Sequence, residues 1–222
     1  HSLLPFTLPR RRSSSRALLA GAFALLLTAS AAHEAAAIPL DFSCITGNSA
    51  TDCGIATSQL SVTLDALGTD QVRLTISNDG PAASVYTRVL FDGGGLDAVD
   101  AIGNTPPGVE FASVSPGVLP GGNGNPIQFT DDLEVSADNP MPQNGVGPGE
   151  TLTIGPGIVA GSDFADVLAA LADGSLRIGM HVQSFASGGS ESVLNLPVPE
   201  PGTLLLLGAG LAGLVQFGRK ER

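Results

Sequence analysis

The 222-residue sequence has few of the residues on which binding sites for sugars and anions usually depend. It contains no tryptophan and one tyrosine, and aromatic residues make up 5% of the chain. This scarcity argues against a carbohydrate platform that stacks sugar rings on indoles. Lysine and arginine number 10, against 21 aspartates and glutamates. Because such an acidic surface repels phosphate groups, we exclude nucleic acid as a partner.

The few basic residues are concentrated at the two ends of the chain. Between Ile38 and Pro197, 18 carboxylates face three arginines and no lysine, which gives a formal charge of −15. This surface suits a domain in an exported compartment and the loose binding of divalent cations. With about 160 residues, the stretch is long enough for one domain with its own core.

The N-terminal residues have the composition of a secretory signal peptide. The arginines at Arg10–Arg12 and Arg16 precede the apolar run "ALLAGAFALLLTA", which small residues follow. We predict a signal peptide over residues 1–37, cut after Ala37 in preference to Ala31, because structured sequence starts at the next residue. A twin-arginine export route is the alternative, although "SSSR" stands where that signal requires an apolar pair.

The C-terminal residues, "VPEPGTLLLLGAGLAGLVQFGRKER", end in an apolar run and a basic terminus. The run from Gly202 to Gly218 carries no formal charge and would extend about 26 Å as a helix, the short end of a membrane span. Its apolar residues surround the whole helix, which favours a transmembrane helix over a buried core helix. Arg219, Lys220 and Arg222 form a basic stop that prefers the cytoplasmic side, so we expect the rest of the chain to lie outside.

The apolar run is preceded by Val198, Pro199, Glu200 and Pro201. The two prolines fix φ and remove two backbone donors, which holds the segment extended, as a peptidase groove requires. Alone, this motif would equally fit a linker kink. The order of motif, span and basic end resembles the PEP-CTERM sorting tail. The resemblance implies recognition of residues 198–222 by an exosortase, a membrane-embedded cysteine peptidase-like enzyme, in Gram-negative bacteria that make extracellular polysaccharide.

A second resemblance covers most of residues 38–197. The segments "FSCITGNSATDC", "NGVGPGE" and "FADVLAALADGSLRIGMHVQSFASGGSES" are similar to a recurrent group of PEP-CTERM proteins with a shared ectodomain. This resemblance implies an exported β-rich domain and leaves its activity open.

Cys44 and Cys53 are the only cysteines. In a chain with an export signal, an even number of cysteines indicates a disulfide. Closing this short surface loop would contribute about 2 to 3 kcal/mol to stability. We do not expect a zinc site, because His33 lies in the signal peptide and His181 is far along the chain. For the same reason, neither sulfur has a histidine nearby to activate it as a catalytic thiol.

Residues 38–197 predict an antiparallel β-sandwich of about eight strands with one short helix. Alternating apolar residues mark "QLSVTLDAL" and "QVRLTIS", which a hairpin at residues 68–70 joins. Further strands are predicted in "SVYTRVLFD", where Val85, Val89 and Phe91 share one face, and in "VEFASV", "IQFTDDLEVSA", "ETLTIG" and "LRIGMHVQSF". On the polar face of the last strand, we expect His181 to be an ordinary surface residue.

The one helix is predicted in "GSDFADVLAALADG", with Ser162 as the N-terminal cap and Gly174 at the end. Its apolar residues repeat at helical spacing and should pack on the sheet. They are Phe164, Val167, Leu168 and Leu171.

No catalytic cluster is evident in the sequence. The stretch "FDGGGLDAVD" supplies Asp92, Asp97 and Asp100, without the spacing or the final glutamate of an EF-hand. The pairs Asp131–Asp132 and Asp163–Asp166 are candidate carboxylates for glycoside hydrolysis. Carboxylates this numerous are more typical of a solvated acidic surface.

We therefore expect an exported, non-enzymatic surface or extracellular-matrix protein without a cofactor or a metal site. Before processing, its C-terminal helix would tether it in the inner membrane, and afterwards it would reach the cell surface or the matrix. The expected partners are an exosortase-type sorting enzyme, the bilayer and extracellular polysaccharide. The alternative functions are a calcium- or glycan-binding adhesive module and, less favoured, a polysaccharide-acting hydrolase.

Overall fold

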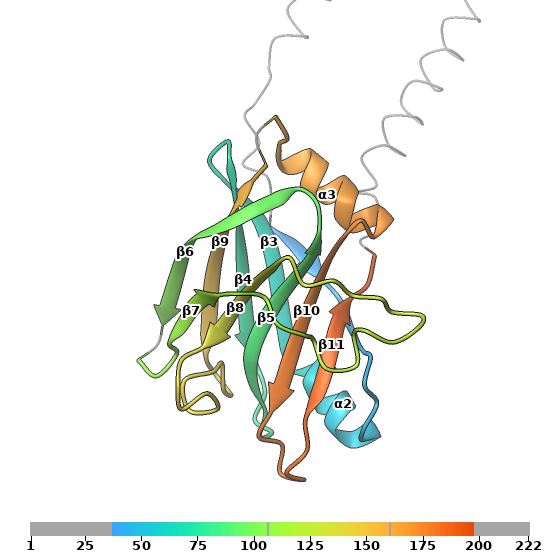
Figure 1. The fold of residues 1–222 in the computed structure, drawn as a ribbon. Helices are drawn as coiled ribbons and strands as arrows, with labels where there is room; N and C mark the ends of the chain where they lie inside the picture. The colour runs from blue at the N-terminus through green and yellow to red at the C-terminus, as the bar shows by residue number, and fades with distance from the viewer. Residues whose placement is uncertain (1–36, 106, 160, 198–222) are drawn as a thin grey trace, which may run out of the picture. The chain divides into compact units, whose positions relative to one another are not determined.

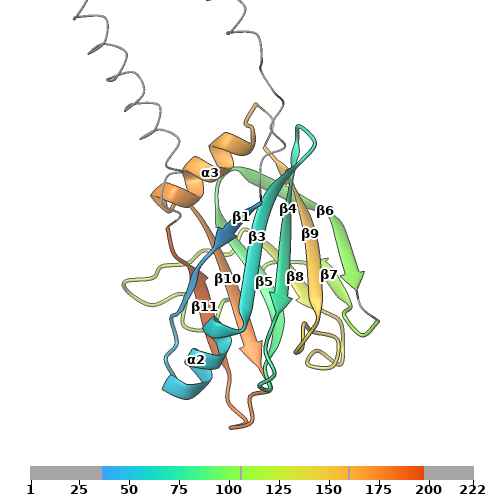
Figure 2. The same cartoon turned by 180° about the vertical axis from the view of Figure 1, so that it is seen from behind.

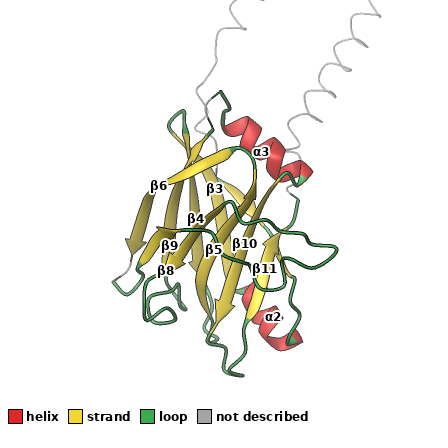
Figure 3. Cartoon of the chain, in the orientation of Figure 1, coloured by secondary structure: helices red, strands yellow, loops and turns green. Residues whose placement is uncertain are grey.

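A computed structural model of the chain describes residues 37–105, 107–159 and 161–197. In these residues, two antiparallel sheets pack face to face, with helices at opposite ends of the sandwich (Figures 1 and 3). The mainly β, two-sheet architecture predicted from the sequence is confirmed. The predicted signal helix and membrane span lie outside the described residues. Of the helices in the described ranges, none is long and apolar enough to cross a membrane.

Sheet A has the strand order β1-β3-β4-β9-β6, and sheet B has the order β2-β11-β10-β5-β8-β7. The strands of sheet A are β1 (Ile38–Leu40), β3 (Leu60–Leu67), β4 (Gln71–Asn78), β6 (Leu96–Thr105) and β9 (Thr151–Ile158). The strands of sheet B are β2 (Phe42–Cys44), β5 (Val85–Gly93), β7 (Phe111–Val114), β8 (Leu133–Ala137), β10 (Leu176–Gln183) and β11 (Glu191–Asn195). The helices are α2 (Ala50–Ser58) and α3 (Phe164–Asp173).

The expectation of about eight strands and one helix was too low, since the described residues form eleven strands and two helices. The strands that the sequence did not predict are β1, β2, β6 and β11. Strands β1 and β2 have three residues each, too few to show alternation. Strand β6 has register shifts between Leu96 and Val99 and between Val99 and Ala101, and such bulges interrupt the period of two.

The predicted loop between the two cysteines ends inside helix α2, which includes Cys53 and continues to Ser58. Ser49 caps this helix, because its hydroxyl accepts a hydrogen bond from the backbone N–H of Asp52 at 3.2 Å. The short helix has no strong apolar stripe, and of its residues only Asp52 and Ala56 are buried. Helical periodicity therefore gave no signal for it.

Helix α3 occupies the predicted segment, with a different first cap. Asp163, and not Ser162, is the N-cap, and its carboxylate accepts hydrogen bonds from the N–H groups of Ala165 and Asp166. The Asp166 carboxylate in turn accepts from the N–H of Asp163, which completes a capping box. Gly174 ends the helix at φ +78°, as predicted.

The strongest strand predictions are confirmed in register. Strands β3 and β4 form a hairpin in which Leu64 pairs with Leu74 and Leu67 with Gln71, so that residues 68–70 form the turn. In β5, Val89 and Phe91 are buried as predicted, but Tyr86 is buried beside them in place of Val85. A register shift between His181 and Val182 of β10 explains this difference, because it reverses which face the first residues of β5 present.

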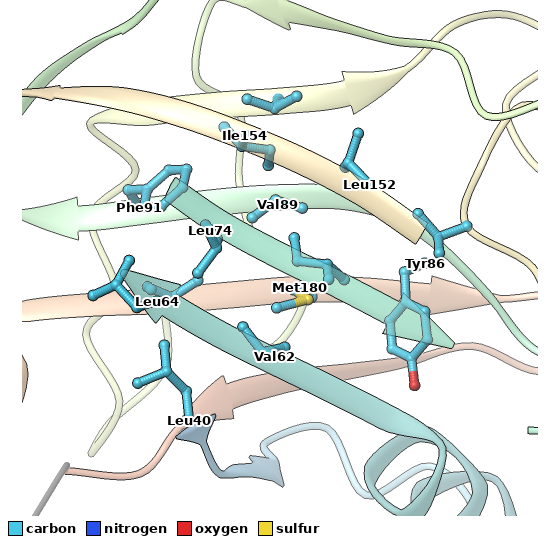
Figure 4. Packing of buried hydrophobic residues seen from close by; sticks show 14 of the residues in the cluster. Leu40, Val62, Leu64, Leu74, Tyr86, Val89, Phe91, Leu152, Ile154 and Met180 are labelled. Atoms are coloured by element: carbon cyan, nitrogen blue, oxygen red, sulfur yellow. The ribbon is translucent and has the colours of Figure 1, made fainter. Parts of the chain in front are cut away.

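The core lies between the two sheets (Figure 4). Sheet A contributes the inward side chains of β3, β4 and β9, such as Leu74 and Ile154, and sheet B contributes those of β5 and β10, such as Phe91 and Met180. Tyr86 is fully buried, and its hydroxyl donates to the carbonyl of Ala56 at 2.6 Å. Burial raises its pKa far above the ordinary value.

The first two described strands, β1 and β2, and the loop that follows them are held by strand β3 and by the last strand, β11. Strand β1 pairs in sheet A and β2 in sheet B, where β2 lies beside β11 and Cys44 is opposite Val193. The disulfide between Cys44 and Cys53 ties β2 to helix α2, which confirms the predicted pairing. Fully buried Glu191 accepts hydrogen bonds from the Thr46 hydroxyl and from the N–H groups of residues 48 and 49, which lie at 3.1 and 2.6 Å.

We expect Glu191 to make the stability of the domain depend on pH. Burial raises the pKa of its carboxyl, but the hydrogen bonds from Thr46 and from the amides of residues 47–49 outweigh burial and hold the pKa below its ordinary value. The stability from a depressed pKa is present above the ordinary value and is lost as the pH falls through the folded-state value. Glu191→Gln should therefore lower the free energy of unfolding at pH 7 by about 1 to 3 kcal/mol.

Urea unfolding from pH 7 to pH 3 tests this expectation. The difference between Glu191→Gln and the parent should shrink as the pH falls below the ordinary pKa of a glutamate and through the lower folded-state value. Glu110→Gln, a change at an exposed residue, should follow the parent throughout. A constant difference across the whole range would contradict the assigned role of the charge.

Candidate functional surfaces

The outer face of sheet B is covered by the β7–β8 loop, residues 115–132 (Figure 1). The sequence predicted that "IQFTDDLEVSA" is one strand, but β8 starts only at Leu133. The residues before Leu133 belong instead to this loop. Two of the three arginines in residues 38–197, Arg88 and Arg177, hold the loop on the sheet.

Arg88 on β5 forms a two-point ion pair with Glu134 on β8, with N···O distances of 2.6 and 2.9 Å. Its remaining nitrogen donates to the carbonyl of Val118 at 3.0 Å, and Glu134 accepts from the N–H of Gly117 at 2.7 Å. The hydrogen bond with Glu134 raises the pKa of the guanidinium. Because Glu134 is only 4% exposed, removal of Arg88 would leave a buried charge without its partner.

Arg177 on β10 holds the other end of the loop. Its guanidinium donates to the carbonyls of Ile127 and Gln128 at 2.6 and 2.7 Å, and it pairs with Asp92 on β5. It also lies 5.3 Å from the centre of the Phe129 ring, within the range of a cation–π interaction. One side chain therefore binds two backbone carbonyls, a carboxylate and an aromatic ring.

A small second core lies between the loop and the sheet. It consists of Leu90 from β5 with Leu119 and Phe129 from the loop. Gly179 on β10 makes room for it, since a Cβ at this position would lie 2.4 Å from Leu119 Cδ2 and 3.2 Å from Phe129 Cζ. The glycine is thus required for close approach of the loop.

Asp131 borders an open cavity of about 470 Å³ that residues of this loop line. Its Oδ2 accepts from the N–H of Leu119 at 3.1 Å, and its Oδ1 is buried without a hydrogen-bond partner among the described residues. Burial raises the pKa of this carboxyl. Carboxylate, backbone and Thr130 groups give the cavity polar atoms, while Val118 and Phe129 give it apolar walls.

The other candidate carboxylates have structural contacts. Asp132 accepts from the N–H of Gly93 at 2.8 Å, and the pair Asp163–Asp166 forms the capping box of α3. Asp92 is paired with Arg177, whereas Asp97 and Asp100 are exposed on β6. In the described part of the chain, no group of three or more histidine, cysteine or acidic side chains is placed to hold a metal ion.

His181 lies half-buried on the outer face of sheet B rather than fully exposed. Its Nδ1 is 3.2 Å from the Ser192 hydroxyl. Burial and, to a lesser extent, the charge of Arg88 lower the pKa of its imidazole.

The outer face of sheet A carries rows of hydroxyl groups, and no other described element crosses it (Figure 2). One row joins Thr63, Thr75 and Thr153, which are paired across β3, β4 and β9. In the next row, the Ser77 and Thr151 hydroxyls lie 2.9 Å apart. These residues alternate with inward core residues along each strand. In the sequence, these residues appear only as polar positions between apolar ones. The pairing register of β3, β4 and β9 is what aligns them in rows.

The sorting-motif residues Val198, Pro199, Glu200 and Pro201 and the basic stop Arg219, Lys220 and Arg222 lie outside the described residues. The described chain leads directly to the motif. Strand β11 ends at Asn195, Leu196 donates its N–H to the carbonyl of Asp41 at 2.7 Å, and Pro197 is the last described residue.

The fold thus defines a two-sheet β-sandwich that ends directly before a C-terminal tail. Residues 197–220 match the family model of the PEP-CTERM protein-sorting motif. The chain therefore carries this motif, as we predicted from residues 198–222. The motif indicates an exported protein that an exosortase sorts. No curated protein and no solved structure matches the chain. The shared ectodomain group stays a prediction.

We expect Gly179→Leu to displace the β7–β8 loop from sheet B. The added side chain would occupy the space of Leu119 and Phe129, so stability should fall by about 1 to 3 kcal/mol and the loop should become sensitive to proteases. Gly94→Leu is the matched control, since a Cβ there meets nothing within 4 Å. Limited proteolysis with mass mapping is the measurement. Equal protection of residues 115–132 in both variants would contradict the assigned packing.

Proposed function

We propose that the protein is a non-enzymatic surface or extracellular-matrix protein whose β-sandwich is exported, held briefly by its tail and then processed. In this proposal, residues 1–37 are the signal peptide, residues 38–197 the exported domain and residues 198–222 the sorting tail with its membrane helix. The observation that carries the proposal is the PEP-CTERM sorting motif at residues 197–220.

Contacts within the domain support a non-enzymatic role. Its three arginines, Arg73, Arg88 and Arg177, are each paired with a carboxylate. The candidate hydrolytic pairs at residues 131–132 and 163–166 accept hydrogen bonds from backbone N–H groups. These groups are engaged in holding loops and a helix end, and an acid–base pair needs carboxylates that are free to reach a substrate.

A second candidate function is glycan binding at the hydroxyl rows of sheet A. Neighbouring strands are about 4.8 Å apart, and outward residues along one strand about 6.7 Å apart. The rows therefore present donors and acceptors at regular intervals to a polymer that carries hydroxyl groups. Each contact would be weak because it replaces a hydrogen bond to water, and repeated contacts along the polymer would supply the affinity.

The tail prediction is tested by intact mass spectrometry of the protein from its native host, in membrane and extracellular fractions. We expect the parent protein to lose the residues after the motif, Val198–Pro201, and Glu200→Ala to keep its original end at Arg222 in the membrane fraction. Glu110→Ala, at an exposed residue directly before β7, should be processed like the parent. A parent protein that ends at Arg222 in every fraction would instead be a single-pass anchored protein.

The glycan prediction is tested with the double variant Thr75→Val and Thr153→Val. Valine keeps the shape and the strand preference of threonine, so stability should change by less than about 0.5 kcal/mol, while co-sedimentation with the host polysaccharide should weaken. Thr51→Val with Thr130→Val, both exposed and away from this face, is the control pair. If the parent does not co-sediment with the polysaccharide, sheet A is not a glycan-binding face.

A further inference from the structure

Both ends of the described domain point toward the end that carries α3. Strand β1 starts at Ile38, opposite Leu64, and runs antiparallel to β3, so the chain before Ile38 leads toward the β3–β4 turn. Strand β11 continues past Asn195, whose side chain accepts from the N–H of Ile178, toward the start of β10. Strand β10 starts at Leu176, directly after α3. We call this end of the sandwich the α3 end (Figures 1 and 2).

The sorting motif follows the α3 end with almost no spacer. Four residues, Val198–Pro201, separate Pro197 from the apolar run that starts at Gly202. Even a fully extended chain spans at most about 18 Å between the Cα atoms of Pro197 and Gly202. If the run enters the bilayer, as the proposed function requires, the α3 end lies next to the membrane surface while the tail is intact.

The α3 end is strongly acidic. It carries six exposed aspartates on the β3–β4 turn, the start of β6, the end of the β7–β8 loop and helix α3, namely Asp70, Asp97, Asp132, Asp163, Asp166 and Asp173. Two arginines lie near this end, and both are already paired: Arg177 with Asp92 and Arg73 with Asp65. The opposite end exposes fewer carboxylates, among them Asp79, Glu110 and Asp138.

The α3 end also exposes apolar side chains. Of the five large exposed apolar residues in the described part, three lie here, namely Leu67, Val159 and Leu196, with exposed fractions of 36, 39 and 45%. Beside Leu196, a groove of about 420 Å³ runs between the end of α3 and the first and last strands of sheet B. Leu171, Leu194 and Ile45 supply apolar walls to it. Apolar residues within a polar rim are typical of a protein-binding surface.

We propose that the α3 end is the surface on which the membrane-embedded sorting enzyme docks while it cuts the tail. The inference rests on the proposed function. Docking at this end would place the motif next to the enzyme, because the motif starts two residues after Leu196. No flexible linker separates the motif from the docked domain. The charge of the α3 end requires a basic patch on the enzyme, around a contact with the exposed apolar residues.

Charge disfavours the two other occupants of this surface. An anionic lipid surface repels six exposed carboxylates, and a second copy of the chain would bring two acidic ends together. An integral-membrane protein with a basic outer surface fits both the charge of the α3 end and its distance from the bilayer.

The test compares tail cutting of full-length variants in the native host by pulse-chase and intact mass. Asp70→Lys, Asp97→Lys and Asp173→Lys together reverse charge at the α3 end. Asp79→Lys, Glu110→Lys and Asp138→Lys make the same change in net charge at the opposite end. We expect the first set to slow cutting about tenfold and the second set to cut at the parent rate. A 12-residue Gly/Ser insertion after Pro197 should make both sets cut equally. With this flexible linker, the motif can reach the enzyme whether or not the α3 end is docked on it.

A photoreactive residue at Ala169, exposed on α3, identifies the occupant, with the same residue at Ser58 on α2 as control. A cross-link from position 169 to the sorting enzyme supports the proposal. A cross-link to lipid or to a second copy overturns it in favour of that occupant. Equal cutting rates for both charge-reversed sets overturn this inference alone, whereas an uncut parent protein overturns the proposed function and the inference with it.

Discussion

The pairing of β2 with β11 is the interaction on which the closure of the domain depends. In sheet B, β2 is an edge strand whose neighbour is β11, so the first strand of this sheet is held by the last one. Buried Glu191 on β11 binds the loop that leads into α2, and the disulfide joins that helix back to β2. A chain without residues 191–195 would therefore lose the partner of its own beginning. Because these residues come directly before the tail, the domain can close only after nearly all of it has been synthesised.

The outer faces of the two sheets differ, because arginines hold a loop over sheet B. Arg88 and Arg177 bind backbone carbonyls in the β7–β8 loop and hold it across sheet B, and the glycine at position 179 leaves room for its apolar residues. Within the residues that the structure describes, sheet A has no such cover, and its outer face carries rows of threonine and serine. Two of the three arginines in residues 38–197 are thus engaged in covering one face, while the third, Arg73, pairs with Asp65 on sheet A.

The sequence predicted the strands in which apolar residues alternate without interruption, such as the hairpin of Leu64 and Leu74. It failed where the alternation is broken or too short, at the bulges of β5 and β6 and at β1 and β2. It also extended β8 into Ile127–Asp132, where alternation is present but Arg177, 50 residues away in the chain, binds the backbone carbonyls. The sorting tail could be predicted because all of its residues are adjacent in the sequence. The hydroxyl rows and the α3 end could not, because they arise from pairing between distant segments.

The end of β11 determines how the motif is presented. Among the described residues, Leu196 makes the last backbone hydrogen bond of this segment, to the carbonyl of Asp41. Pro197 follows and has no N–H with which to continue the pairing of β11 with β10. An N–H at position 197 would face β10, where continuing the register of β11 places it opposite Leu176, so the proline removes the bond that would carry this pairing one step closer to the motif. The proline therefore ends the strand at the point where the folded domain has to stop and the substrate for sorting has to begin. The stability of the last strand and the accessibility of the motif are in this way set by adjacent residues.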